Sequence, residues 1–372
     1  MTLLALPSTR EEAWRWSDLS ALPELADRRP SGTVPADLPW LGCAGPKLAF
    51  VDGRPVHQEG LEPLTVGQIN LEPSDHALAR LVGKYGWKLK LGSDHAPAGL
   101  VQIIHVSTGG ADHLPAKIVL DPDAQASVLE TFIGTGWINR FTSIALAKGA
   151  RLMLVRRLLC EGGFVSLTDR ASVGEGASLT MTTLAAGEAD SRLDGQIMLA
   201  GEAAFAEAGG ALLARGKQRH DANLVVRHDA IGGMSRQLWR SVADDAAACS
   251  VAARVEVARD AQKSDGEQSL KGLLLARTAT INAKPELEIF ADDVKCAHGA
   301  TVGELDQNAL FYLRSRGISL DEAKALLTRA FVADAIERIG EEQVREAFHA
   351  DAQQWLGGQI LPVPGRKGRI TP

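Results

Sequence analysis

Short apolar runs separated by turn residues fill the middle of the chain, between residues 99 and 302. Examples are residues 100–106, 150–155, 223–226 and 253–257. Gly, Asp and Asn punctuate these runs at intervals too short for an intervening helix, so the segment is expected to be rich in β-strands. Two-residue hairpin signals are few, which disfavours a simple antiparallel meander. The segment is therefore predicted to wind as a coil or to use crossover connections.

A right-handed parallel β-helix meets these constraints. Each coil would stack on the next at ~4.8 Å and bury a stripe of small aliphatic side chains. With about 20 to 25 residues per coil, the segment would hold roughly eight to ten coils. No clean internal period is visible, so an antiparallel sandwich is also compatible with the pattern alone.

Helical regions are predicted on both sides of this β-helix core, making the chain mainly β with helical flanks. Residues 1–98 are expected to form a mixed and partly helical N-terminal region. Residues 303–357 are expected to form a helical domain, because Ser319 and Glu322 have the spacing of a capping box ahead of an apolar period. Residues 358–372 are rich in Gly and Pro and are predicted to be a flexible tail.

Composition narrows the cellular setting. Forty basic against 46 acidic residues give a net charge of −6, so the strongly basic footprint of a nucleic-acid-binding protein is missing. Four cysteines stand far apart, which disfavours a disulfide framework or a zinc knuckle. No long uncharged apolar run predicts a membrane span or a secretory signal. We therefore expect a cytoplasmic protein that binds neither nucleic acid nor membrane.

Other candidate motifs are weak. Residues 210–218 imitate a nucleotide-binding Walker loop, but Ala211 and Gln218 replace required residues, so no nucleotide is expected to bind this chain. Histidines gather loosely in two groups without familiar zinc spacing and are expected at surface or turn positions. They are His95, His105, His113, His220 and His228.

Cys296 and His298 lie where strand periodicity gives way to helical periodicity. Side chains at i and i+2 of a strand share a face, so the thiol and the imidazole can face one partner or one metal ion. A single Cys-x-His is not a metal motif, and a buried cysteine beside a surface histidine at a domain joint also fits. Lys295 would favour the thiolate if its ammonium group lies within reach.

The segment 284–318, KPELEIFADDVKCAHGATVGELDQNALFYLRSRGI, resembles the signature of the SufB/SufD family, the scaffold proteins of the Suf iron–sulfur cluster assembly machinery. It is more similar to the SufD branch than to the SufB branch. Residues 7–19, PSTREEAWRWSDL, resemble the family's opening phrase.

This resemblance implies a β-helix scaffold without catalytic activity of its own. The implied partners are SufB, paired through the end of the β-helix, and the SufC ATPase, bound through the C-terminal helices. In isolation the chain can also pair with itself. The implied cargo is iron or a transient iron–sulfur cluster shared with SufB, contacted by His298 and then by Cys296, with the remaining ligands supplied by the partner.

Two other function classes stay open on the sequence alone. β-Helices also host carbohydrate-active enzymes, although the chain has only two tyrosines for stacking on sugars. A homodimeric structural protein without a metal role is the other alternative.

Overall fold

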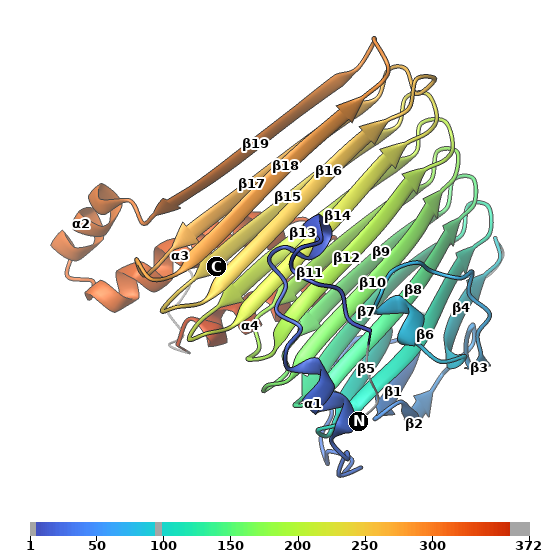
Figure 1. The fold of residues 1–372 in the computed structure, drawn as a ribbon, viewed down its shortest axis with the longest axis horizontal. Coiled ribbons are helices and arrows are strands. Elements are labelled where there is room, and N and C mark those ends of the chain that lie inside the picture. Colours follow the sequence, from blue (N-terminus) through green and yellow to red (C-terminus); the bar gives the residue numbers. More distant parts are fainter. Residues whose placement is uncertain (1–4, 94–98, 358–372) are drawn as a thin grey trace, which may run out of the picture.

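Two long β-sheets, each built from alternate strands of the chain, form the body of the molecule (Figure 1). The computed structural model describes residues 5–93 and 99–357, so the tail predicted at 358–372 lies outside the described residues. One sheet has ten strands, in the spatial order β19 (Lys295–Glu304), β17 (Asp265–Leu274), β15 (Met234–Ala243), β13 (Phe205–Ala214), β11 (Ser178–Ala185), β9 (Arg151–Leu158), β7 (Gln125–Gly134), β5 (Val101–Ser107), β1 (Lys47–Val51) and β2 (Arg54–Glu59). The other has nine strands, in the order β18 (Thr280–Ile289), β16 (Ala248–Val257), β14 (Arg219–His228), β12 (Asp190–Leu199), β10 (Phe164–Val173), β8 (Trp137–Leu146), β6 (Ala111–Leu120), β4 (Tyr85–Leu91) and β3 (Leu64–Gln68).

This arrangement is a parallel β-helix, which confirms the predicted fold class. From β4 to β19 every pairing within a sheet is parallel, and each strand is followed along the chain by a strand of the other sheet. The pairs Phe164–Asp190 and Ala248–Thr280 set the extremes of coil length, 26 and 32 residues. The predicted 20 to 25 residues per coil is therefore too short. Each coil holds two strands of up to ten residues, and the connecting turns vary in length, which hides the period in the sequence.

The sheets also begin earlier in the chain than residue 99, where the sequence places the start of the core. β1 pairs in parallel with β5, and β4 pairs in parallel with β6. β2 and β3 then join the edges by antiparallel pairing. A strand added in this way covers backbone groups that would otherwise stay unpaired.

The turns that lead from the nine-stranded sheet to the ten-stranded sheet share a left-handed residue with φ between 54° and 70°. In successive turns this residue is Asp123, Gly149, Gly176, Ala203, Gly232 or Lys263. Its amide donates to a carbonyl of the next coil, as Gly176 N does to Glu202 O (2.8 Å). Glycine adopts this conformation at low cost, which explains part of the high glycine content of the chain.

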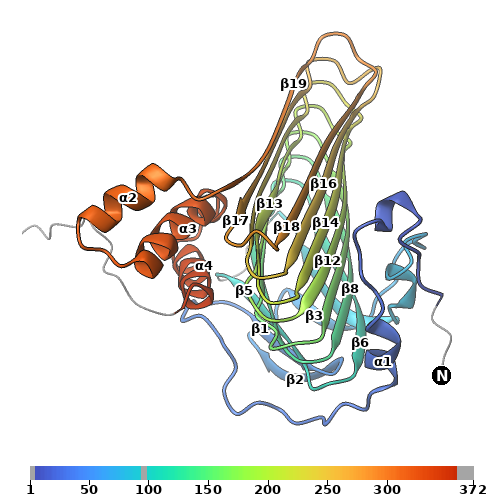
Figure 2. The same ribbon diagram turned by 60° about the vertical axis from the view of Figure 1, so that its left-hand side comes forward.

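Helices cover the outer faces of both sheets (Figure 2). α3 (Leu320–Ile336) and α4 (Glu342–Trp355) pack Val332, Ile336 and Phe348 onto outward-facing aliphatic side chains of the ten-stranded sheet. Asp351 of α4 accepts two hydrogen bonds from buried Arg157 of β9, at 2.6 and 2.8 Å. These contacts make α3 and α4 part of the folded body.

The nine-stranded sheet is covered by the N-terminal segment, with η1 (Glu12–Trp14), α1 (Leu22–Asp27) and η2 (Ala79–Leu81). Trp14 and Leu22 pack there against Trp137 and Phe164. α2 (Gln307–Ser315) differs from α3 and α4, because it projects away from the sheets (Figure 2). Among the described residues, no helix has the length and apolar character needed to cross a membrane.

Candidate functional site

Cys296 and His298 lie together on the last strand of the ten-stranded sheet. β19 pairs in register with β17, which places Cys296 beside Gly266 and His298 beside Gln268. The side chains of Gly266 and Gln268 belong to the interior face, because Gln268 is buried and a Cβ on Gly266 would lie 3.2 Å from the interior side chain of Val255. The thiol and the imidazole therefore continue the interior face of the solenoid where the stack of coils ends. Cys296 is half-buried and His298 is exposed.

The end of the solenoid is open on both sheets. β19 pairs only with β17, and β18 pairs only with β16, so each strand leaves one edge unpaired. Apart from Cys296, every residue of β19 is exposed. Ile289, Phe290 and Val302 add exposed apolar surface at this end, with 39%, 59% and 43% of their area accessible. Unpaired edges beside apolar side chains are typical of a surface that binds another chain.

The thiol of Cys296 is held in its protonated form. Burial raises the pKa of Cys296, and Asp265 adds to this effect, while a backbone hydrogen bond with Gly266 partly opposes it. The expectation that Lys295 favours the thiolate is wrong, because adjacent side chains of a strand point to opposite faces. Binding a metal ion or receiving sulfur would therefore have to displace the thiol proton.

The donor set of this pair suits iron but is incomplete. Thiolate sulfur and imidazole nitrogen are both ligands of iron in proteins. Within residues 5–93 and 99–357, no group of three or more His, Cys, Asp or Glu side chains could hold a metal ion. The pair can therefore contribute two ligands, and the rest must come from another molecule or from sulfide.

A chain of buried charges crosses the interior of the solenoid far from this end. Arg156 donates to Glu130 (2.7 Å) and to both carboxylate oxygens of Asp169 (2.5 and 2.8 Å). Glu130 also bonds His105 (3.1 Å), whose other ring nitrogen accepts from Arg140 (3.2 Å). Burial alone would raise the pKa of Glu130, but Arg156 and His105 lower it to about 2. Arg156 thus neutralises two buried carboxylates.

Sequence inspection missed this chain of charges. Its only local signal is a lone charged residue inside an apolar run, as in the segment 127–132 around Glu130. Such a residue usually faces solvent on a half-exposed strand. Here both sheet faces are covered, so an inward charge must find a partner on another coil.

The expected surface or turn positions of the histidines are wrong for His105, His220 and His228, which lie on strands with 0%, 2% and 0% of their surface exposed. His113 is also on a strand, β6, and His95 lies outside the described residues. Burial lowers the pKa of each of these four described histidines to about 4. They are therefore neutral side chains of the folded state rather than surface groups.

These buried histidines predict a pH-dependent stability. The unfolded chain binds protons at histidine near pH 6.5, whereas the folded chain does so only near pH 4. Stability is therefore complete above pH 6.5 and is lost as the pH falls toward 4, by about 3 kcal/mol per histidine. Denaturant unfolding at intervals of pH should show this slope, and His220→Gln should make it shallower. His349→Gln, on the solvent side of α4, is the control, and a flat profile between pH 7 and pH 4 would contradict the prediction.

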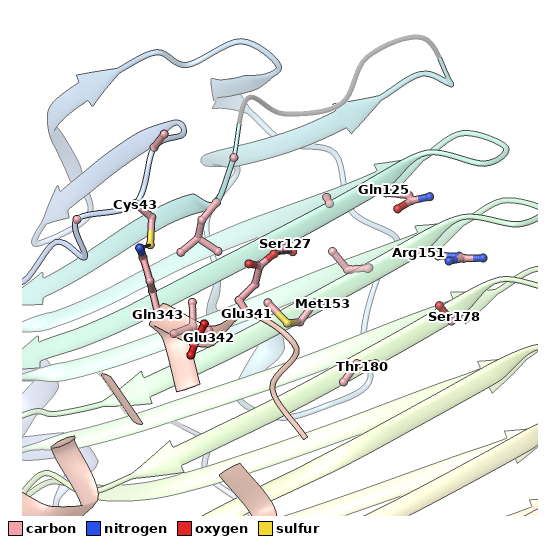
Figure 3. Close-up of a pocket in the computed structure, with 17 residues that line it drawn as sticks. Cys43, Gln125, Ser127, Arg151, Met153, Ser178, Thr180, Glu341, Glu342 and Gln343 are labelled. Atoms are coloured by element: carbon pink, nitrogen blue, oxygen red, sulfur yellow. Dashed lines mark hydrogen bonds between the residues drawn. The ribbon is translucent and has the colours of Figure 1, made fainter. Parts of the chain in front are cut away.

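A hollow of about 760 Å³ lies elsewhere, between the start of α4 and the outer faces of β7, β9 and β11 (Figure 3). Cys43 donates to the side chain of Gln343 across it (2.7 Å), and Ser127 donates to Glu341 (3.2 Å). Burial and Glu341 raise the pKa of Cys43, so this thiol is a poor nucleophile. No aromatic side chain lines the hollow, which makes it unsuited to stacking on sugar rings. It serves as packing between α4 and the N-terminal loop.

Comparison with known proteins identifies relatives of this chain. Residues 105–331 match the family model described as SUF system FeS cluster assembly, SufBD core domain. The iron–sulfur cluster assembly protein SufD of Escherichia coli is 27% identical over 95% of this chain and 90% of its own length. A SufBD family protein of Synechocystis is 29% identical over 60% of this chain and 52% of its own length. SufD of Bacillus subtilis is 29% identical over 40% of this chain and 34% of its own length.

Proposed function

Because this chain belongs to the SufB/SufD family of iron–sulfur cluster assembly proteins, we propose that it is the SufD-type scaffold subunit of a complex with SufB and SufC. It pairs with SufB through the open end of the solenoid and binds the SufC ATPase through its C-terminal helices. A transient cluster is built where the two scaffolds meet. The observation that carries this proposal is the position of Cys296 and His298 on the open terminal strand.

The open end supports pairing with a similar solenoid. Strands β18 and β19 each offer ten residues with one unpaired edge, and a second solenoid would offer edges of the same kind. Such a junction would bring ligands of both chains to one place. It would also cover Ile289 and Phe290, which are costly to leave in water.

Iron and sulfide are the cargo of this site. His298 supplies an imidazole nitrogen and Cys296 a thiolate sulfur, while SufB supplies the other ligands. The pair is half-complete by itself, so the cluster would be held weakly by either chain alone and could be passed on. ATP would be bound by the SufC subunits and not by this chain, in a complex located in the cytoplasm.

Copurification tests the pairing. The chain, SufB and SufC are produced together with an affinity tag on this chain, and the mass of the purified material is measured by light scattering. We expect a complex that contains all three proteins. The chain produced alone is expected to pair with itself, since its open end is unsatisfied. A chain that remains a homodimer when SufB is present would contradict the proposal and favour a structural homodimer.

Binding of the ATPase is expected to depend on α2. Phe311 and Tyr312 have 75% and 55% of their surface exposed, although large aromatic side chains favour burial. We expect Phe311→Ser to weaken SufC binding by at least about tenfold, as for an aromatic anchor of an interface. Titration of SufC onto the purified chain, followed by calorimetry, measures the effect.

Tyr85→Ser, an exposed aromatic residue on β4, is the control for that measurement. Deleting α3 and α4 would not be a clean test, because it would expose the apolar outer face of the ten-stranded sheet. Unchanged SufC affinity in the Phe311 variant would remove α2 from the docking surface.

A further inference from the structure

Two buried glutamines lie directly behind His298 in the interior of the solenoid. The register of β15, β17 and β19 aligns Gln237, Gln268 and His298 in one column, with all three side chains on the same face. Adjacent members of such a column are separated by about 4.8 Å, the spacing of neighbouring strands. Gln237 and Gln268 are 1% and 2% exposed. The column therefore runs from the open end into the closed interior.

Three polar atoms of these glutamines have no hydrogen-bond partner within the described part of the chain. They are Oε1 of Gln237 and both Oε1 and Nε2 of Gln268. The remaining atom, Nε2 of Gln237, donates to the carbonyl oxygen of Arg254 (2.8 Å). Buried amide groups without partners destabilise a folded protein, and native interiors rarely retain them.

Gln102 shows how a buried glutamine of the same sheet is normally satisfied. It lies on β5, is 1% exposed, and its Nε2 donates to the carbonyl oxygen of Leu41 (3.1 Å). Its Oε1 accepts from the amide of Leu41 (2.8 Å). The unpaired amide of Gln268 is thus not a general feature of this fold. It occurs next to the proposed ligand of the cargo.

We propose that Gln268 is a positioning residue for His298, an inference that rests on the proposed function. Its Oε1 accepts the ring N–H of His298, and its Nε2 donates to Oε1 of Gln237, which is anchored on Arg254. This single arrangement pairs all three unpartnered atoms. It is completed when the partner chain and the cargo order the exposed imidazole.

The arrangement determines which ring nitrogen of His298 is free to bind iron. A histidine ligand commonly donates its second ring N–H to a carbonyl or carboxylate, which fixes the tautomer and the ring orientation. A carboxamide oxygen provides this acceptor without adding a buried charge. Gln268 would therefore act on iron affinity through His298, without touching the cargo.

Two substitutions separate positioning from folding. Gln268→Met keeps the size of the side chain and removes the unpaired amide, so the isolated chain should unfold at the same or a higher temperature. In the purified complex with SufB and SufC, the affinity for Fe²⁺ should fall about 10- to 100-fold, as measured anaerobically by competition with a coloured chelator. Gln268→Glu keeps an acceptor for the ring N–H and should recover most of the affinity.

Gln102→Met and His298→Ala complete the set. Gln102→Met should lower the unfolding temperature and leave Fe²⁺ affinity unchanged, whereas His298→Ala should lose Fe²⁺ affinity. If His298→Ala weakens binding but Gln268→Met does not, the positioning role is wrong and the proposed function stands. Weak binding by both Gln268 variants, together with a lower unfolding temperature, would show a structural role and also overturn the inference. If His298→Ala binds Fe²⁺ normally, the proposed iron contact fails, and this inference fails with it.

Discussion

Replacing Arg156 by Met is expected to destabilise the isolated chain by about 3–5 kcal/mol, the cost typical of breaking a buried ion pair. The guanidinium group is 3% exposed and is the shared partner of Glu130 and Asp169. Without it, two carboxylates remain in an interior that contains few other donors. Burial alone would lower the pKa of Arg156, and the two carboxylates raise it instead, so the arginine stays charged. The thermal midpoint should fall by roughly 5–10 °C.

Arg151→Met is the matched control for this prediction. Arg151 lies on the same strand, β9, but is exposed, so its loss should change stability by no more than about 0.5 kcal/mol. Adding Glu130→Gln and Asp169→Asn to the Arg156 variant should recover part of the loss, because no uncompensated charge would remain. Equal effects of the Arg151 and Arg156 variants would show that the buried charges do not stabilise the fold.

Replacing His298 by Ala is expected to lower the iron bound by the complex with SufB and SufC at least about tenfold, since the loss of a ligand should cost no less than the loss of a group that supports one. Assembly of the complex should be unaffected, because the imidazole is exposed and forms no hydrogen bond with the residues described. Iron and visible absorption are measured after anaerobic reconstitution with Fe²⁺ and sulfide.

His57→Ala controls for the loss of any histidine, since His57 lies on β2 at the opposite end of the ten-stranded sheet. Cys296→Ser should also reduce the iron bound, because its hydroxyl is a poor replacement for thiolate. A His298 variant that assembles and reconstitutes like the wild type would leave the chain in its family and remove His298 from the chemistry.

The β-helix could be predicted because its constraints are local. Apolar runs, turn residues and the scarcity of hairpin signals are all visible in the sequence, and the segment around Cys296 resembles a known family. Coil length was harder, since turns of different lengths between ten-residue strands obscure the repeat. The capping box at Ser319 and Glu322 is present as predicted, because capping depends on residues only three positions apart.

Partners on other coils could not be predicted in the same way. Glu130 and Arg156, or Gln268 and His298, are neighbours because of a register that depends on coil length. The inward direction of His220 also follows from which face each strand buries, and a shift of one residue would reverse it. For the same reason the effect expected of Lys295 on Cys296 failed, although the two are adjacent in sequence.

The most direct test of the scaffold role compares the iron bound by this chain alone with the iron bound by the same chain paired with SufB. Both samples are reconstituted anaerobically with equal Fe²⁺ and sulfide, desalted and analysed for metal. If the site is completed by the partner, the isolated chain retains little iron, and the pair retains a stoichiometric amount that depends on His298. Stoichiometric iron on the isolated chain, or none on the pair, would contradict a cluster shared between two scaffolds.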